Sequence, residues 1–119
     1  MADAFCGRTD APDYSRVMNP TVTFFENKVK ELTGAAEVIA LNSGMAAISN
    51  TLFSIAAAGK NIVTSRHLFG NTYSFIAGTL SRFGVEPRLC DLTDIGAVEK
   101  VVDSNTCCIY VEIITNPQM

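Results

Sequence analysis

The sequence predicts an α/β fold in which helices are layered around a mostly parallel sheet. Of the 119 residues, 48% are apolar, which is enough to bury a core. Short apolar runs of strand length alternate with stretches in which apolar residues recur at helical spacing. Such alternation is typical of parallel strands joined by helical crossovers. Because ligands bind beyond the carboxyl ends of such strands, the loops at 42–45, 65–72 and 112–117 form the candidate site.

The first helix is predicted over residues 20–33. Residues 1–18 show no periodicity and are interpreted as an extended arm or loop. Asn19 can cap the helix, Pro20 suits its first turn, where a missing N–H costs nothing, and Gly34 provides a stop. The apolar residues at helical spacing are Val22, Phe25, Val29 and Leu32.

The remaining elements alternate between strand and helix. Gly59 and Gly84 are each expected to follow the end of a helix, and Asp91 is expected at the exit of a strand. In order, the predicted elements are a strand at 38–41, an alanine-rich helix from the Asn42-Ser43-Gly44 turn to residue 57, a strand at 61–64, a helix at 71–82, a strand at 85–89, a helix at 95–102, and a β-rich run at 107–114 that ends at Asn116-Pro117.

Charge and composition argue against two classes of partner. The net charge of -3 provides no basic surface for nucleic acid. The sequence has no run of about 18 apolar residues, the length that a membrane helix needs. The N-terminal residues lack the basic-then-apolar order of a secretion signal. We therefore expect a cytoplasmic protein that binds neither nucleic acid nor a membrane.

The four cysteines predict neither disulfides nor a metal site. Cys107 and Cys108 are adjacent, Cys6 and Cys90 are isolated, and His67 is the single histidine. A structural zinc site needs four ligands in paired spacing. We expect no metal, and we interpret the cysteines as small apolar residues of a reduced core.

The turn Ser43-Gly44-Met45 is a candidate anion site. It lies between a predicted strand and a predicted helix, where free backbone N–H groups and the helix dipole favour a phosphate. Gly44 lets the backbone approach an anion closely. A tight turn that merely begins a helix explains the same residues, and the spacing lacks the further glycines or the lysine of nucleotide-binding loops.

Several motifs in order and register resemble one family, the Cys/Met-metabolism PLP-dependent enzymes, which include cystathionine γ-synthase and lyases, methionine γ-lyase and O-acetylhomoserine sulfhydrylase. The resemblance covers nearly the whole chain. The sequence from Leu68 to Tyr73 is most similar to that of the homocysteine-forming sulfhydrylases and the methionine γ-lyases. The motifs are Tyr14-Ser15-Arg16 with Asn19-Pro20-Thr21, Ser43-Gly44-Met45-Ala46-Ala47-Ile48, Phe69-Gly70-Asn71-Thr72-Tyr73, and Glu112 with Asn116-Pro117.

The resemblance implies a fold, a cofactor and a reaction class. The fold would be a truncated PLP-dependent transferase fold (type I, aspartate aminotransferase-like), with three layers, a mostly parallel sheet and an extended N-terminal arm. Residues 1–18 would be that arm, and residues 19–119 would be the first part of the large PLP-binding domain. The cofactor would be pyridoxal 5′-phosphate and the substrate a small amino acid. The reaction would be β/γ-elimination or γ-replacement on homoserine-ester, cystathionine or methionine-type substrates, closest to O-acetylhomoserine sulfhydrylase or methionine γ-lyase.

The resemblance also assigns the phosphate contacts. Ser43, Gly44 and Met45 would bind the cofactor phosphate through the turn described above. Tyr14 and Arg16 would reach from the arm to the cofactor phosphate of a neighbouring subunit, in a homodimer or homotetramer. A planar guanidinium suits this contact because it matches phosphate oxygens. A solvated tyrosine and arginine in a loop would explain these two residues alone.

Further roles concern the cofactor ring. Asn116 would hydrogen-bond the phenolic oxygen, and the resemblance places a glutamate at Glu112, for which we expect no direct catalytic role. Phe69 would stack on the ring, where most members have tyrosine, so the stacking surface is kept and the hydroxyl is lost. Tyr73 is interpreted as a packing residue, and His67 as a surface histidine that could also face the site.

The Schiff-base lysine that the resemblance implies would lie beyond Asn116, so we expect no catalytic residue in this chain and no activity from the chain alone. The lysines present are read as solvated charges; they are Lys28, Lys30, Lys60 and Lys100. Two other functions stay open. One is a non-enzymatic fragment that self-associates through the arm and the helix at 20–33. The other is an α/β domain that binds phosphometabolites or nucleotides at the Ser43-Gly44-Met45 turn.

Overall fold

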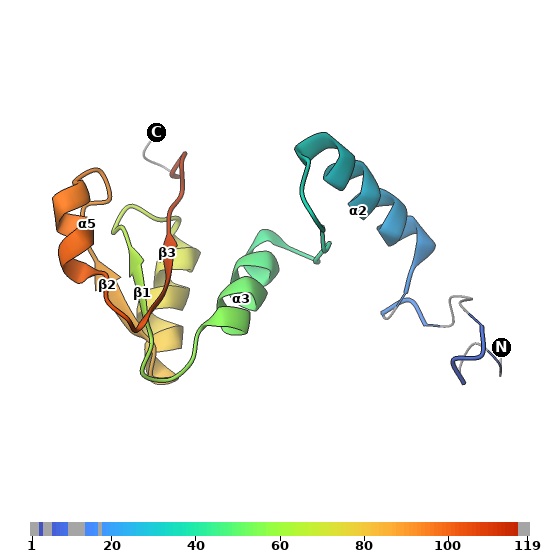
Figure 1. The fold of residues 1–119 in the computed structure, drawn as a ribbon, viewed down its shortest axis with the longest axis horizontal. Coiled ribbons are helices and arrows are strands. Elements are labelled where there is room, and N and C mark those ends of the chain that lie inside the picture. Colours follow the sequence, from blue (N-terminus) through green and yellow to red (C-terminus); the bar gives the residue numbers. More distant parts are fainter. Residues whose placement is uncertain (1–2, 4–5, 10–13, 17, 117–119) are drawn as a thin grey trace. The chain divides into compact units, whose positions relative to one another are not determined.

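The computed structural model describes residues 3, 6–9, 14–16 and 18–116, which belong to two compact units. The first unit is Met1–Asn42 and contains one long helix. The second is Ser43–Met119 and contains the sheet with its helices (Figure 1). The predicted boundary between arm and domain at residue 18 remains a prediction, and the predicted arm residues 1–2, 4–5, 10–13 and 17 lie outside the described residues.

In the first unit, helix α2 (Pro20–Thr33) begins and ends where the sequence predicts. The Asn19 side chain accepts hydrogen bonds from the N–H groups of Thr21, at 3.0 Å, and Val22, at 3.4 Å. Gly34 follows the helix in the left-handed region at φ 69°, and its N–H donates to the Lys30 carbonyl. Local capping chemistry therefore sets both ends of this helix.

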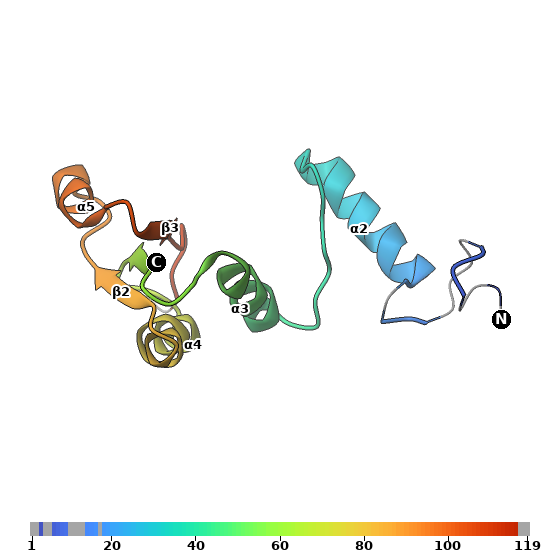
Figure 2. The same ribbon diagram turned by 60° about the horizontal axis from the view of Figure 1, so that its bottom comes forward.

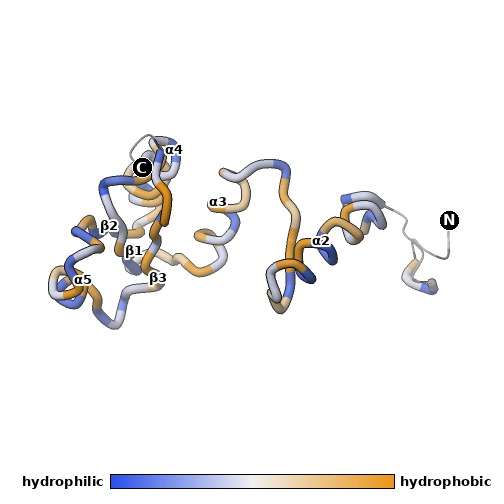
Figure 3. The backbone as a smooth tube through the Cα atoms, turned by 90° about the horizontal axis from the view of Figure 1, so that it is seen from above, coloured by the Kyte–Doolittle hydropathy of each residue, from blue (hydrophilic) through white to orange (hydrophobic). Residues whose placement is uncertain are grey.

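The apolar side chains of α2 are open to solvent. No residue of the helix is buried, and Phe24, Phe25 and Leu32 are 65%, 57% and 86% exposed. Figure 3 shows apolar and polar segments alternating along the helix, as an amphipathic helix requires. The helix therefore carries apolar surface that the described residues do not cover.

The strand predicted at 38–41 is wrong. These residues form no regular structure, because a strand needs a neighbour with which to pair and no described strand pairs with them. The N–H of Ala40 instead donates to the Glu26 carboxylate at 2.8 Å.

In the second unit, three strands form a parallel sheet in the order β2-β1-β3, with β1 in the centre. They are β1 (Asn61–Thr64), β2 (Glu86–Leu89) and β3 (Thr106–Tyr110), and both pairings are parallel, which confirms the predicted sheet. All four residues of β1 are buried, as a central strand requires. The β-rich run predicted over 107–114 stops at Tyr110, because β1 ends opposite it at Thr64 and offers no further partner.

The helices of this unit lie on both faces of the sheet (Figure 2). α5 (Ile95–Val101) lies on the face opposite α4 (Gly70–Tyr73), which continues directly into a π-helical segment η1 (Ser74–Leu80). α3 (Gly44–Ile55) contacts α4. The predicted helix at 71–82 is present, but its π-helical stretch was not predicted. Ile76 and Leu80 are four residues apart, a spacing that faces the core in either kind of helix.

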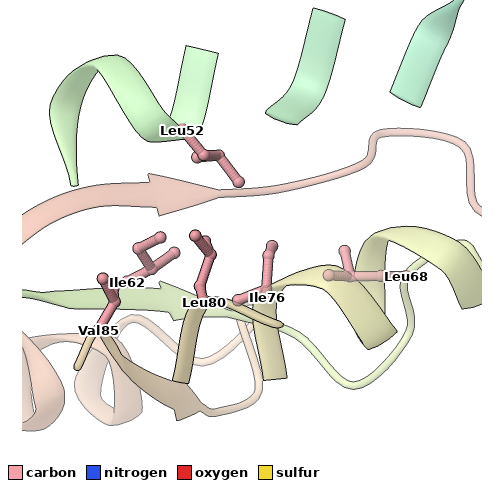
Figure 4. Close-up of a cluster of buried hydrophobic side chains, with 6 residues drawn as sticks. All are labelled: Leu52, Ile62, Leu68, Ile76, Leu80 and Val85. Atoms are coloured by element: carbon pink, nitrogen blue, oxygen red, sulfur yellow. The ribbon is translucent and has the colours of Figure 1, made fainter. Parts of the chain in front are cut away.

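The core lies between the sheet and the α3–α4–η1 side (Figure 4). Each fully buried Leu or Ile contributes about 1.5–3 kcal/mol to stability. Cys107, Cys108 and Tyr110 of β3 pack against this core, as expected for apolar cysteines, whereas Cys6 is exposed and that part of the prediction is wrong. The converging core residues, all at most 8% exposed, are Leu52, Ile62, Leu68, Ile76, Leu80 and Val85.

Candidate functional site

The candidate site lies where the parallel strands end. The three strands run in the same direction, so the loops after Thr64, Leu89 and Tyr110 leave the same edge of the sheet. Two contacts tie the predicted site loops together. The Phe69 N–H donates to Glu112 Oε2 at 2.8 Å, and the Thr72 hydroxyl contacts Met45 Sδ at 3.8 Å. Segments separated by 43 and 27 positions in the sequence therefore meet at this edge.

The beginning of α3 is open to an anion. Ser43 is the N-cap, in extended backbone conformation, and its Oγ accepts from the Ala46 N–H at 3.1 Å. The first N–H groups of a helix have no partner inside the helix, so those of Gly44 and Met45 point outward with the positive end of the dipole. No atom lies within 4 Å of the position that a Cβ at Gly44 would take. The first turn contains no acidic side chain that would repel an anion.

A buried hydroxyl lies behind this turn. Thr72 is fully buried, and its hydroxyl contacts both the Met45 sulfur and the Tyr110 phenol. The Thr64 hydroxyl donates to the Tyr110 carbonyl at 2.8 Å. Burial raises the pKa of Tyr110, the Glu112 charge adds to this, and the Thr72 hydroxyl opposes it. Sequence reasoning missed Thr72 because a buried threonine in a helix has the same local pattern as an exposed one.

Phe69 lies at the start of α4, the helix whose Thr72 contacts Met45 of this turn. It directly precedes α4, with φ -52° and ψ 133°, and no side chain caps that helix. Its neighbour Leu68 is in the core, whereas Phe69 is 41% exposed. An aromatic face is therefore accessible at the strand ends, on a backbone held by Glu112.

A hollow of about 190 Å³ lies at the same edge of the sheet. On its wall, Asp91 Oδ1 accepts from the Thr93 N–H at 2.9 Å and from the Thr93 hydroxyl at 2.6 Å. These bonds lower the pKa of Asp91, burial opposes them, and the nearby His67 lowers it further. His67 thus faces the hollow, although its own side chain is exposed. The lining residues are Ser65, His67, Asp91, Leu92, Thr93, Val111, Glu112 and Thr115.

The three remaining predicted site residues are Tyr14, Arg16 and Asn116. Tyr14 and Arg16 belong to the first unit, where the Arg16 guanidinium carbon lies 5.0 Å from the centre of the Tyr14 ring. Both side chains are exposed. Asn116 is also exposed, after the bend that follows Glu112, and its predicted neighbour Pro117 lies outside the described residues. Tyr73 packs against the core, as predicted.

Neither of the two lysines in the second unit lies at the carboxyl end of a strand. Lys28 and Lys30 are in α2, where each pairs with a glutamate at 2.8 Å. Lys60 immediately precedes β1, at the opposite end of that strand, and Lys100 is on the last turn of α5.

Metal and membrane features are absent from the part of the chain that the structure describes. No group of three or more His, Cys, Asp or Glu side chains there is placed to hold a metal ion. Within the same residues, no helix has both the length and the apolar character to span a membrane.

Comparison with known proteins shows which family this chain resembles in sequence. The family model for Cys/Met metabolism PLP-dependent enzymes matches residues 1–119. The L-methionine gamma-lyase of Fusobacterium nucleatum subsp. polymorphum is 37% identical over 106 residues, which cover 89% of this chain and 27% of that protein. The chain therefore spans about a quarter of the length of the curated relatives that it matches, at their N-terminal portion.

Two solved structures show the same fold. The O-acetylhomoserine sulfhydrylase of Wolinella succinogenes is 48% identical, with a TM-score of 0.80 over 84% of this chain and 28% of that one. A Campylobacter jejuni protein, proposed to be an O-acetylhomoserine (thiol)-lyase, is 37% identical, with a TM-score of 0.85 over 98% of this chain and 29% of that one. It carries a pyridoxyl-lysine 5′-monophosphate. These matches confirm the predicted fold class.

Proposed function

We propose, from the premise that this chain belongs to the Cys/Met metabolism PLP-dependent enzyme family, that its second unit forms part of the pyridoxal 5′-phosphate site of a sulfur amino-acid enzyme. One observation carries the proposal. The open turn at Ser43–Met45 and the exposed ring of Phe69 lie on elements that the Thr72–Met45 contact joins. A phosphate site and an aromatic face at one sheet edge are what a phosphorylated aromatic cofactor requires.

The residues at the turn fit a phosphate. Gly44 and Met45 offer two backbone N–H donors at the positive end of a helix of 12 residues. Ser43 Oγ accepts from Ala46, which leaves its own O–H free to donate outward. The open space at Gly44 lets phosphate oxygens approach the backbone.

The residues near the ring position fit an aromatic heterocycle. Phe69 offers a stacking face but no hydroxyl, so proton transfer by a tyrosine at this position is ruled out. Asn116 is exposed after the loop that Glu112 anchors, and its side-chain amide can donate to the phenolic oxygen of the cofactor.

A second copy of the chain completes the phosphate site in this proposal. Tyr14 and Arg16 are exposed and lie against one another, so they can act as a pair. The planar Arg16 guanidinium matches the geometry of phosphate oxygens, and it would bind the cofactor phosphate of the neighbouring subunit in a homodimer or homotetramer. The exposed apolar residues of α2 support self-association.

When bound, the cofactor supplies an electron sink at the substrate α-carbon, which supports β/γ-elimination or γ-replacement on sulfur amino acids and homoserine esters. The residues of this chain bind the phosphate and orient the ring. In the second unit, neither Lys60 nor Lys100 lies at the carboxyl end of a strand, and Lys28 and Lys30 form ion pairs in the first unit, so we propose that the chain binds the cofactor without catalysing a reaction.

The test is binding of pyridoxal 5′-phosphate and of inorganic phosphate by the full chain, measured by titration calorimetry, with Gly44→Ala beside Gly78→Ala. Both glycines have open space at the Cβ position, so neither substitution creates a clash. Alanine keeps the backbone N–H, but its methyl group fills the open space through which a phosphate approaches. We therefore expect Gly44→Ala to weaken binding of pyridoxal 5′-phosphate and of inorganic phosphate by about tenfold, the effect of losing one hydrogen bond of about 1.4 kcal/mol. Gly78→Ala should change neither affinity.

Two results would contradict the proposal. One is wild-type chain that does not bind pyridoxal 5′-phosphate, with or without self-association. The other is thermal stabilisation by ATP or NAD as strong as that by pyridoxal 5′-phosphate, which would favour a general phosphometabolite-binding domain.

A further inference from the structure

Glu112 is the residue through which the loop after β3 holds the segment before α4. Its Oε2 accepts a hydrogen bond from the Phe69 N–H at 2.8 Å, and the two residues are 43 positions apart in the sequence. We infer that Glu112 is a positioning residue: its carboxylate fixes the backbone of Phe69 so that the ring is held at the angle at which it stacks on the cofactor. This inference rests on the proposed function.

The neighbours of Phe69 show why one hydrogen bond can fix it. Leu68 on one side is 8% exposed and belongs to the core, and Thr72 on the other side is fully buried. Phe69 itself is 41% exposed, with no side-chain cap at the start of α4. The segment is therefore anchored before and after Phe69, and Glu112 supplies the anchor at Phe69 itself.

The loop that carries Glu112 leaves its apolar side chains open to solvent. Val111, Ile113 and Ile114 are 57%, 96% and 76% exposed, and β3 has already ended at Tyr110. The half-buried residues between 111 and 116 are Glu112 and Thr115. The bond from Glu112 to Phe69 therefore also holds the loop that leads to Asn116.

A carboxylate suits this role better than a neutral acceptor. Hydrogen bonds to an ionised acceptor are shorter and roughly twice as strong as those between neutral groups. Glu112 also lines the hollow at the strand ends, so the carboxylate lies between that hollow and the Phe69 backbone. A graded series, Glu112→Gln and Glu112→Ala, therefore separates the charge from the hydrogen bond.

The first readout is hydrogen exchange of the Phe69 amide in the full chain without ligand. We expect exchange to be about tenfold or more faster in Glu112→Ala, because the acceptor is lost, and intermediate in Glu112→Gln, which keeps a neutral acceptor. Glu99→Gln, on the exposed side of α5, is the control and should leave the Phe69 amide unchanged. Equal Phe69 exchange in wild type and Glu112→Ala would overturn the inference, whatever the cofactor does.

The second readout compares two ligands. We expect Glu112→Ala to weaken the binding of pyridoxal 5′-phosphate several-fold and to leave the binding of inorganic phosphate unchanged. Only pyridoxal 5′-phosphate has a ring on which Phe69 can stack. Equal weakening of both ligands, or of neither, would overturn the inference. A wild-type chain that binds neither ligand would instead refute the proposed function. In that case, hydrogen exchange of the Phe69 amide in the Glu112 variants alone decides whether Glu112 holds the Phe69 backbone in place.

Discussion

The buried Thr72 hydroxyl contacts the sulfur of Met45 at 3.8 Å, and this contact joins the helix that begins the anion site to the helix that follows Phe69. The same hydroxyl bonds the phenol of Tyr110. A single side chain thus connects α3, α4 and β3. The arrangement of the candidate site therefore depends on a buried residue that contacts one of its members, Met45.

Replacing Thr72 by Val tests this connection. Val keeps the shape of the side chain but removes the hydroxyl contacts with Met45 and with the half-buried Tyr110, which should lower the free energy of unfolding by about 1 kcal/mol. Thr72→Ser keeps the hydroxyl and should recover most of that loss. Urea unfolding measures both variants, beside the exposed-site control Thr79→Val. A Thr72→Val loss no larger than that of the control would show that the hydroxyl is dispensable.

Asp103 should make the stability depend on pH in the acidic range. Arg88 bonds its carboxylate at 2.7 Å and Asn61 at 2.9 Å, and these bonds, Arg88 first, lower the pKa of Asp103 to about 2. Since the folded pKa lies below the unfolded value of 3.8, the contribution is complete above 3.8 and is lost as pH falls towards about 2.

The free energy of unfolding, measured across that interval, should therefore decrease as the pH is lowered in wild type, and it should decrease less in Asp103→Asn. Asn61→Ala removes one donor and so raises the folded pKa of Asp103 towards 3.8, which should make the fall smaller and end it at a higher pH. An unchanged slope in Asp103→Asn would mean that Asp103 does not carry this pH dependence.

The cysteines should differ in reactivity. Burial, with a smaller effect from Cys107, raises the pKa of Cys108 to about 11, so the thiolate that alkylating reagents attack is scarce. Cys6 is exposed. Iodoacetamide at pH 8, followed by mass spectrometry, should modify Cys6 first and Cys108 only after denaturant is added. Equal rates for the two residues in the folded chain would contradict this assignment.

An apolar groove of about 260 Å³ between α5 and β3 should promote aggregation. Ile95 and Ile109 on its walls are 73% and 51% exposed. Ile95→Glu places a charge in the groove, and at the first turn of α5 this charge also favours the helix dipole. Light scattering should show less aggregate than in Ser104→Glu, which adds the same charge at an exposed turn. The same aggregation in both variants would show that the groove is not the cause.

Local chemistry made the helix ends and the central strand predictable. Asn19, Pro20 and Gly34 set the ends of α2, and the apolar run at 61–64 is a buried strand as predicted. The family motifs were readable in the same way, since the turn at Ser43 and the Phe69 segment are short and contiguous.

Non-local contacts were not predictable. Residues 38–41 look like a strand, yet strand formation depends on a partner that the local pattern cannot show. The Glu112–Phe69 bond spans 43 positions, and neither residue signals the other in the sequence. The burial of the Thr72 hydroxyl could not be predicted for the same reason, because its partners come from α3 and β3.

The central claim is that the turn at Ser43–Met45 binds the phosphate of pyridoxal 5′-phosphate. The most direct measurement is a titration followed through the backbone amide resonances of Gly44 and Met45. Both resonances should move, in a saturable way, with pyridoxal 5′-phosphate and with inorganic phosphate, and neither should move with pyridoxal, which lacks the phosphate. Amides at Gly44 and Met45 that stay fixed while pyridoxal 5′-phosphate binds elsewhere on the chain would contradict the claim.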